Sequence, residues 1–226
     1  MIVTQEKPLE EILSFMDPFK KILVLGCDGC TQPPRSLKEA EIYAELIRLA
    51  GKIRDKGHES KTFTVSRQCD DNILQENLTT ELEGIDVVLS MACGIGPQTI
   101  VEVFPEIIVF PAQNTLFMGS EKMQEATLSE RCAGCGDCIL DETGGICPIA
   151  RCSKSLLNGP CGGSNQGKCE ISPEIPCAWQ LIYDRLKVLG RLDTLEEIRP
   201  PKDWSTSRDG GTRRIIREDI MLPSQE

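Results

Sequence analysis

The chain has 226 residues, which is enough for one domain of ordinary size and a substantial additional segment. Its 35 acidic and 25 basic residues give a formal net charge of −10, which argues against nucleic acid or an anionic membrane surface as a partner, because both attract basic patches. The single histidine, His58, leaves little from which a histidine-based triad or a histidine-rich zinc site could be built. Its place after Gly57 predicts an exposed turn residue.

Twelve cysteines are several times the ordinary number for a chain of this size, and indicate either a disulfide framework or metal ligation. The first residues are acidic where a signal peptide is basic, and they lack an apolar core. No later stretch reaches the roughly 18 consecutive apolar residues of a membrane span. We therefore expect a cytoplasmic protein without membrane insertion, in which thiols stay reduced and clustered cysteines more often hold metal.

Strand and helix patterns alternate along the first half of the chain. After an N-terminal arm over residues 1–19 with an amphipathic helix over 9–16, the patterns predict strands over 20–26, 61–66, 85–91 and 106–112, and helices over 36–56, 71–82 and after Pro97. Ser36 and Glu39 have the spacing of a capping box. The alternation predicts an α/β fold with a parallel sheet and right-handed crossovers. We expect a Rossmann-like or flavodoxin-like domain over residues 20–129.

The pattern fails from residue 130 onward. Glycine, proline, serine and cysteine dominate up to Cys177, and only residues 178–189 recover a helical stripe. A segment so poor in apolar residues cannot offset the entropy of its own ordering by hydrophobic burial. We therefore expect residues 130–226 to form an irregular cysteine-rich metal-binding segment followed by a C-terminal helix and tail.

The first four cysteines of this segment have C-x2-C-x2-C spacing with a distant fourth that precedes a proline: Cys132, Cys135, Cys138 and Cys147. Three close thiolates can wrap one side of a compact cluster and the fourth can complete it, as in bacterial ferredoxins. Gly134 and Gly136 allow the tight turns that direct backbone amides at sulfur. The spacing predicts a [4Fe-4S] cluster; a structural zinc site with the same four thiolates is the alternative.

The next four cysteines lie about eight residues apart between glycine-rich loops: Cys152, Cys161, Cys169 and Cys177. They predict a second cluster. Two-cluster ferredoxins exchange a ligand between motifs, so the sequence identifies a pool of eight ligands but not how they divide. Trp179 either shields a cluster or is a core aromatic residue at a helix start, and the second interpretation is favoured.

The remaining four cysteines each lie just past a predicted strand: Cys27, Cys30, Cys69 and Cys93. The carboxyl ends of parallel strands meet at one edge of the sheet, where ligands bind, so these residues could form a third metal or redox site. Separate, partly buried thiols are the favoured interpretation, because free cysteine behaves as a small apolar residue.

The loops at that edge do not resemble a nucleotide-binding site. GCDGCTQPP contains neither G-x-G-x-x-G nor a P-loop, and Pro33 and Pro34 remove amides that a phosphate would need. Gly94 and Gly96 lack the third glycine of the motif. We expect no NAD or flavin to bind this domain.

Several stretches together resemble the methylenetetrahydrofolate reductase C-terminal domain family: GCDGC, MACGIGPQTIVEV, NTLFMG, RCAGCGDC, GGICPIARCSKSLLNGPCGGS, GKCE, PCAWQLIYDRL, GRLD and PPKDWS. The resemblance extends from Lys20 to Ser205. It implies two [4Fe-4S] clusters held by the eight cysteines from Cys132 to Cys177, and a non-catalytic subunit that transfers electrons from an external donor. It also implies a MetF-type catalytic partner, a TIM barrel with FMN that reduces 5,10-methylenetetrahydrofolate to 5-methyltetrahydrofolate. A structural zinc-binding docking subunit without redox activity is the alternative.

Overall fold

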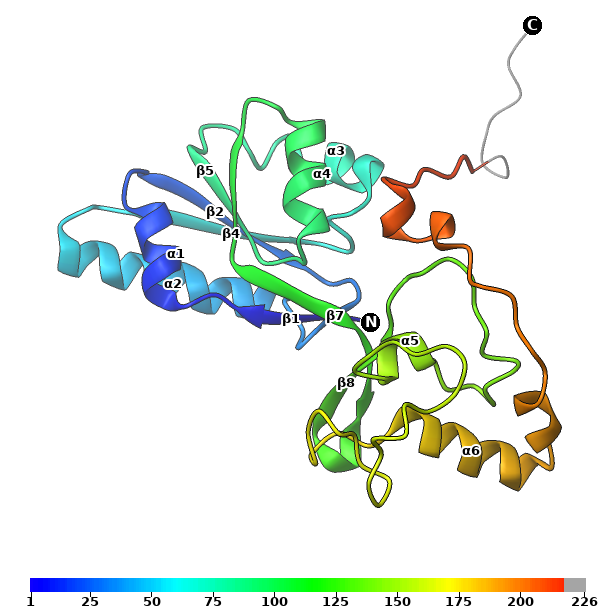
Figure 1. Cartoon of the computed structure of the whole chain (residues 1–226). Coiled ribbons are helices and arrows are strands. Elements are labelled where there is room, and N and C mark those ends of the chain that lie inside the picture. Colours follow the sequence, from blue (N-terminus) through cyan, green and yellow to red (C-terminus); the bar gives the residue numbers. More distant parts are fainter. Residues whose placement is uncertain (218–226) are drawn as a thin grey trace, which may run out of the picture. The chain divides into compact units, whose positions relative to one another are not determined.

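We describe residues 1–217 of the chain in a computed structural model (Figure 1). The chain divides into two compact units, one ending at Ser129 and the other beginning at Glu130. Within the described residues, no helix has both the length and the apolar composition needed to cross a membrane.

The first unit contains a parallel four-stranded sheet in the order β4 (Glu59–Val65), β2 (Lys21–Cys27), β5 (Val87–Ser90) and β6 (Ile108–Pro111). The order corresponds to that of flavodoxin-like sheets, in which the first strand of the sheet pairs with the second and the third. The predicted α/β class and parallel sheet are confirmed.

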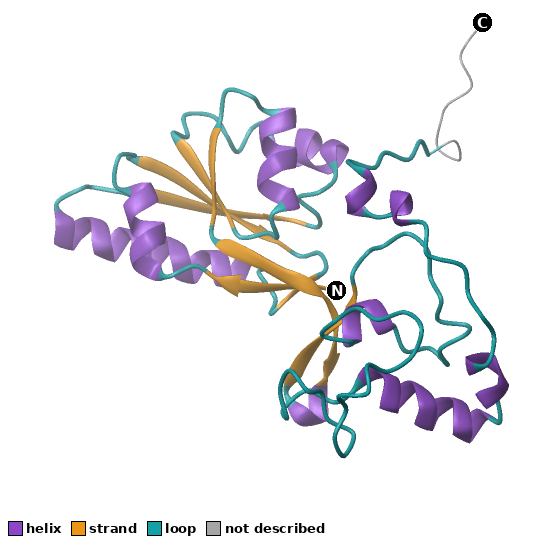
Figure 2. Ribbon diagram, viewed as in Figure 1, coloured by secondary structure: helices purple, strands orange, loops and turns teal. Residues whose placement is uncertain are grey.

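Two layers of helices cover this sheet (Figures 1 and 2). One core lies between the sheet and the helices α1 (Leu9–Met16) and α2 (Leu37–Arg54); the other core lies on the face covered by α3 (Asp71–Leu78) and α4 (Ile95–Val103). Successive residues of β2 alternate between the two cores, with Val24 in the first and Leu25 in the second. Because both faces are buried, the strand has a continuous apolar sequence.

The predicted long helix over 36–56 is confirmed as α2, and its start is fixed by the predicted capping box. The Ser36 backbone amide and hydroxyl donate to the Glu39 carboxylate at 2.9 and 2.6 Å. The hydroxyl bond in particular holds the pKa of Glu39 below its ordinary value. The predicted helix over 71–82 is too long, because α3 ends at Leu78 and a turn follows.

A second, mixed sheet was not predicted. Its strands are β3 (Thr31–Gln32), β1 (Ile2–Glu6), β7 (Gln113–Lys122) and β8 (Thr127–Cys132), with β1 parallel to β3 and antiparallel to β7. The arm expected over residues 1–19 therefore contains a strand as well as helix α1. Local sequence gives little indication of this strand, because it is short and its main partner is more than 100 residues away. The 3-10 helix Met123–Glu125 separates β7 from β8.

The prediction for His58 was wrong. Its side chain is only 1 % exposed, its Nδ1 lies 2.8 Å from the carbonyl oxygen of Phe19, and its ring packs against Gly51 of α2. Strand β4 begins at the next residue, so the chain turns sharply after α2 and the His58 imidazole lies against the end of that helix.

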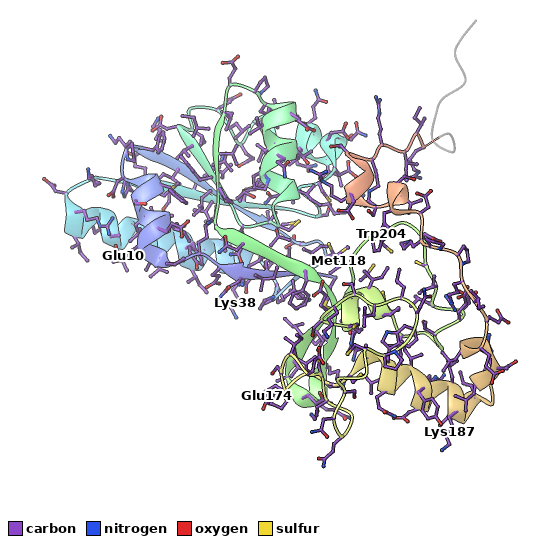
Figure 3. The ribbon with its side chains drawn as sticks, in the orientation of Figure 1. Glu10, Lys38, Met118, Glu174, Lys187 and Trp204 are labelled. Atoms are coloured by element: carbon purple, nitrogen blue, oxygen red, sulfur yellow. The ribbon has the colours of Figure 1, made fainter. Side chains whose placement is uncertain are left out.

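The second unit is mostly loop (Figure 2). Its helices are α5 (Pro148–Arg151) and α6 (Ala178–Leu189), and its 3-10 helices are Leu192–Leu195, Trp204–Thr206 and Arg208–Gly210. Helix α6 has the predicted bounds and ends at Gly190, whose φ of 67° suits a glycine cap. The outer face of α6 carries the exposed Lys187 (Figure 3). The buried core of this unit consists of Trp179, Ile182 and Leu186.

Candidate metal centres

The second set of four cysteines lines one small cavity in the second unit: Cys152, Cys161, Cys169 and Cys177. Cys152 follows the last residue of α5, and Cys177 precedes the first residue of α6. The loop between them turns back on itself, since the Cys169 amide donates to Ile175 and the Cys177 amide donates to Gly167, both at 2.8 Å. The fold thus brings four cysteines from 26 residues of irregular chain to the lining of one cavity.

Trp179 forms one wall of this cavity and is also part of the small core. Its indole Nε1 donates to the carbonyl of Leu156 at 3.0 Å, and Cys152 and Cys177 pack against the same core. The favoured interpretation of Trp179 as a core aromatic is confirmed. The same ring lies beside two of the predicted ligands, where it excludes water from one side of the cavity.

Hydrogen-bond donors surround the sulfur atoms of this set. The pKa of Cys169 is lowered by the backbone amide of Ile171, then by the hydroxyl of Ser153, whose oxygen lies 3.6 Å from the sulfur. The backbone amide of Gly163 donates to the Cys161 sulfur at 3.4 Å. Donors of this kind stabilise thiolates, which are the form of cysteine that binds metals.

A larger cavity of about 890 Å³ is also lined by Trp179. Cys177, the glycine-rich loop over residues 157–167 and residues 194–199 contribute to its lining. The exposed rings and aliphatic side chains at its rim include Tyr183 and Leu195. The second set of cysteines therefore borders this cavity at Cys177.

The first set of cysteines is more widely distributed. Cys132 is the last residue of β8 and Cys147 immediately precedes α5. Gly134 has a φ of 63° and its amide donates to the Cys132 sulfur at 3.3 Å, as predicted for a turn that directs amides at sulfur. Arg151 lies close enough to Cys147 to interact with it electrostatically; the pKa of Arg151 is nevertheless lowered, mainly by partial burial.

In neither set of cysteines are the side chains arranged as metal ligands. Within residues 1–217, no group of three or more histidine, cysteine, aspartate or glutamate side chains is close enough together to hold a metal ion. All twelve cysteines are free thiols. The second set lines one cavity, and the ligand assignments of both sets are predictions.

A segment near the C-terminus, which we call the strap (residues 202–213), crosses the loop of the first set. Thr206 donates to the carbonyl of Cys135 at 2.9 Å, and Arg213 donates to the carbonyl of Gly134 at 2.6 Å. Lys202, with only 4 % of its side chain exposed, bonds both the carbonyl and the carboxylate of Asp137. Trp204 marks the strap in Figure 3. Sequence reasoning missed these residues; their only local signal is a run of basic and hydroxyl side chains in a tail.

The strap gives a matched pair of test substitutions. Gly136 and Gly145 both have positive φ, 83° and 88°, but a Cβ at Gly136 would overlap the carbonyl oxygen of Thr206, whereas a Cβ at Gly145 meets nothing within 4 Å. Both alanine variants carry a backbone strain of about 1 kcal/mol. We expect Gly136→Ala alone to displace the strap and expose Lys202 and Arg213 to trypsin. Equal cleavage rates in the two variants would show that the strap does not depend on this contact.

The remaining four cysteines lie in the first unit. Cys27 and Cys93 are buried and Cys30 and Cys69 are exposed. Cys27 ends β2, and the other three lie in loops that follow β2, β4 and β5.

The comparisons with known proteins concern mainly the second unit. Residues 110–205 match a family model described as methylene-tetrahydrofolate reductase C terminal. This match supports that family for the C-terminal part of the chain. It includes all eight cysteines of the first and second sets, and it is narrower than the resemblance seen from Lys20 to Ser205. The curated proteins and the solved structures gave no match.

Proposed function

We propose that this chain is the small iron-sulfur subunit of a methylenetetrahydrofolate reductase of the MetVF type, corresponding to MetV. In this proposal the chain binds two [4Fe-4S] clusters and associates with a MetF-type flavoprotein, which carries FMN and performs the chemistry on folate. The observation that carries the proposal is the convergence of Cys152, Cys161, Cys169 and Cys177 on one cavity, within the segment that matches the family.

The residues around that cavity fit a cluster in their chemistry. Four thiols are the usual ligand set of a [4Fe-4S] cluster. Amides near Cys161 and Cys169 supply the hydrogen bonds that stabilise sulfur charge, and Trp179 excludes water from one side. When bound, the clusters would accept and donate single electrons. The chain's own part is to hold them, shield them and bring one near an acceptor.

The cysteines of the first set are spread more widely than those of the second set, so they must move further to bind one cluster. Cys132, Cys135 and Cys138 follow the compact spacing of cluster motifs, and the strap holds the backbone of their loop at Gly134, Cys135 and Asp137. We propose that these three thiols and Cys147 bind the other [4Fe-4S] cluster. An exchange of one ligand between the two sets of cysteines is also compatible with the sequence. The alternative function is a docking subunit in which zinc occupies the same thiolates.

Metal analysis of the anaerobically purified chain separates the two functions. The proposal predicts brown protein with about eight iron and about eight acid-labile sulfide per chain, and an EPR signal on reduction. The docking function predicts colourless protein without iron or sulfide, whose zinc is lost when Cys161 is replaced by serine. The second result would refute the electron-transfer proposal.

A further inference from the structure

The four cysteines of the first unit come together at the carboxyl edge of its parallel sheet. Strands β4, β2 and β5 are neighbours in the sheet. Cys69 follows the end of β4, Cys27 ends β2 with Cys30 three residues later, and Cys93 follows the end of β5. The four cysteines that follow these three adjacent strands therefore lie at one edge of the sheet.

A buried glutamine ties the three cysteine-bearing loops to one another. Gln68 is fully buried, and its Nε2 donates to the carbonyls of Leu25 and Gly26 at 2.9 Å each. Its Oε1 accepts from the hydroxyl of Ser90 at 2.6 Å. The residue before Cys69 is thus bonded both to the residues that precede Cys27 and to the strand that precedes Cys93. These bonds fix the spacing of the loops before any ligand binds.

The four cysteines form a buried pair and an exposed pair, and Cys30 and Cys69 are the exposed ones. Cys27 and Cys93 are each only 7 % exposed. None of the four is in a disulfide.

The packing around this edge favours a small ligand. A Cβ at Gly96, near the start of α4, would lie 2.8 Å from the Gln68 Oε1, and one at Gly29, in the loop after β2, would lie 3.3 Å from the carbonyl oxygen of Ser66. Loops this close together leave more room for a single ion than for a cluster of eight atoms. The C-x2-C spacing of Cys27 and Cys30 is typical of zinc sites.

We propose that Cys27, Cys30, Cys69 and Cys93 bind one zinc ion that fastens the carboxyl edge of the first unit. The sulfur atoms do not stand at metal-binding distances in the structure, so binding requires the exposed Cys30 and Cys69 side chains to turn toward the buried pair. This site lies outside the residues that match the family model and is independent of the function proposed for the second unit.

The test measures zinc and iron per chain in the full-length protein, purified anaerobically from medium containing both metals. We expect about one zinc per chain, bound by four sulfur atoms at about 2.3 Å in zinc-edge X-ray absorption. The variants Cys30→Ser and Cys69→Ser change exposed residues, and each should lose the zinc and retain the iron. The matched control is Cys161→Ser, which should retain this one zinc per chain, and any zinc that this variant loses would belong to the second unit.

Four results would overturn the proposal. Wild-type protein could lack zinc, or its zinc could be bound by oxygen and nitrogen. The zinc could persist in both Cys30→Ser and Cys69→Ser. Loss of about four iron atoms from these variants would assign the site to an iron-sulfur cluster instead. X-ray absorption of the wild-type protein shows whether its zinc is bound by four sulfur atoms, even where a variant fails to fold. Loss of zinc from Cys161→Ser alone would place the zinc in the second unit. That result would refute the site proposed here, and it would also refute the electron-transfer function.

Discussion

Replacing Cys161 with serine is expected to remove about four of about eight iron atoms and to unfold much of the second unit. The physical reason is the small core of that unit: burial of Trp179, Ile182 and Leu186 cannot balance the ordering of the loops that carry the cysteines. In the proposed function metal-ligand bonds supply the missing stability, as in other small metal-dependent domains, where apparent binding free energies are about 10–16 kcal/mol for structural zinc. Iron analysis and limited proteolysis measure the two effects.

Ser164→Ala is the matched control for this variant. Ser164 lines the same cavity as Cys161 but supplies no thiolate. The control should keep its iron and its resistance to protease. The first unit, whose two cores are built from apolar side chains, should stay folded in both variants. Equal protease resistance of Cys161→Ser and Ser164→Ala would contradict the view that metal orders this segment.

The second large effect concerns the partner. In the proposed function one cluster of this chain must lie near an acceptor, so we expect the chain to form a lasting complex with a MetF-type flavoprotein. Permanent complexes commonly bury more than about 2,000 Å², whereas brief electron-transfer contacts bury less than about 1,200 Å². Co-expression and affinity purification of a tagged partner should therefore recover the two chains together.

Gel filtration of that complex at nanomolar concentration and high salt distinguishes a lasting interface from an encounter. The 890 Å³ cavity is lined by Tyr183 and Leu195 and also by Glu196, Glu197 and Arg199. High salt screens the charged contacts, so a lasting interface should persist there through its apolar contacts. Dissociation into single chains under these conditions would show that electron transfer, if it occurs, uses a transient contact.

The sequence was most informative where structure depends on local pattern. The aliphatic run in β2 and the Ser36–Glu39 cap predicted a buried parallel strand and a helix, and both are present. Helix α6 has a regular apolar stripe and was predicted with the observed bounds. The class of fold follows from the alternation of such elements.

The sequence was least informative where structure depends on distant contacts. Strand β1 pairs with β7, and the strap bonds a loop more than 60 residues earlier. Burial of His58 depends on its contact with the Phe19 carbonyl across 39 residues. The spacing of the cysteines predicts metal ligation, which stays a prediction, and only the fold shows that Cys152, Cys161, Cys169 and Cys177 line one cavity.

The rate at which the partner's FMN is reduced tests the electron-transfer function most directly. The donor is a reduced low-potential iron-sulfur protein, which is too large to reach a buried flavin, and FMN absorbance is followed by anaerobic stopped flow. The account predicts rapid reduction in the complex and only background reduction in the partner alone. Both samples should still oxidise 5-methyltetrahydrofolate with a small artificial acceptor that reaches the flavin directly. If the partner alone accepts electrons from the protein donor as fast as the complex does, this chain is not an electron conduit.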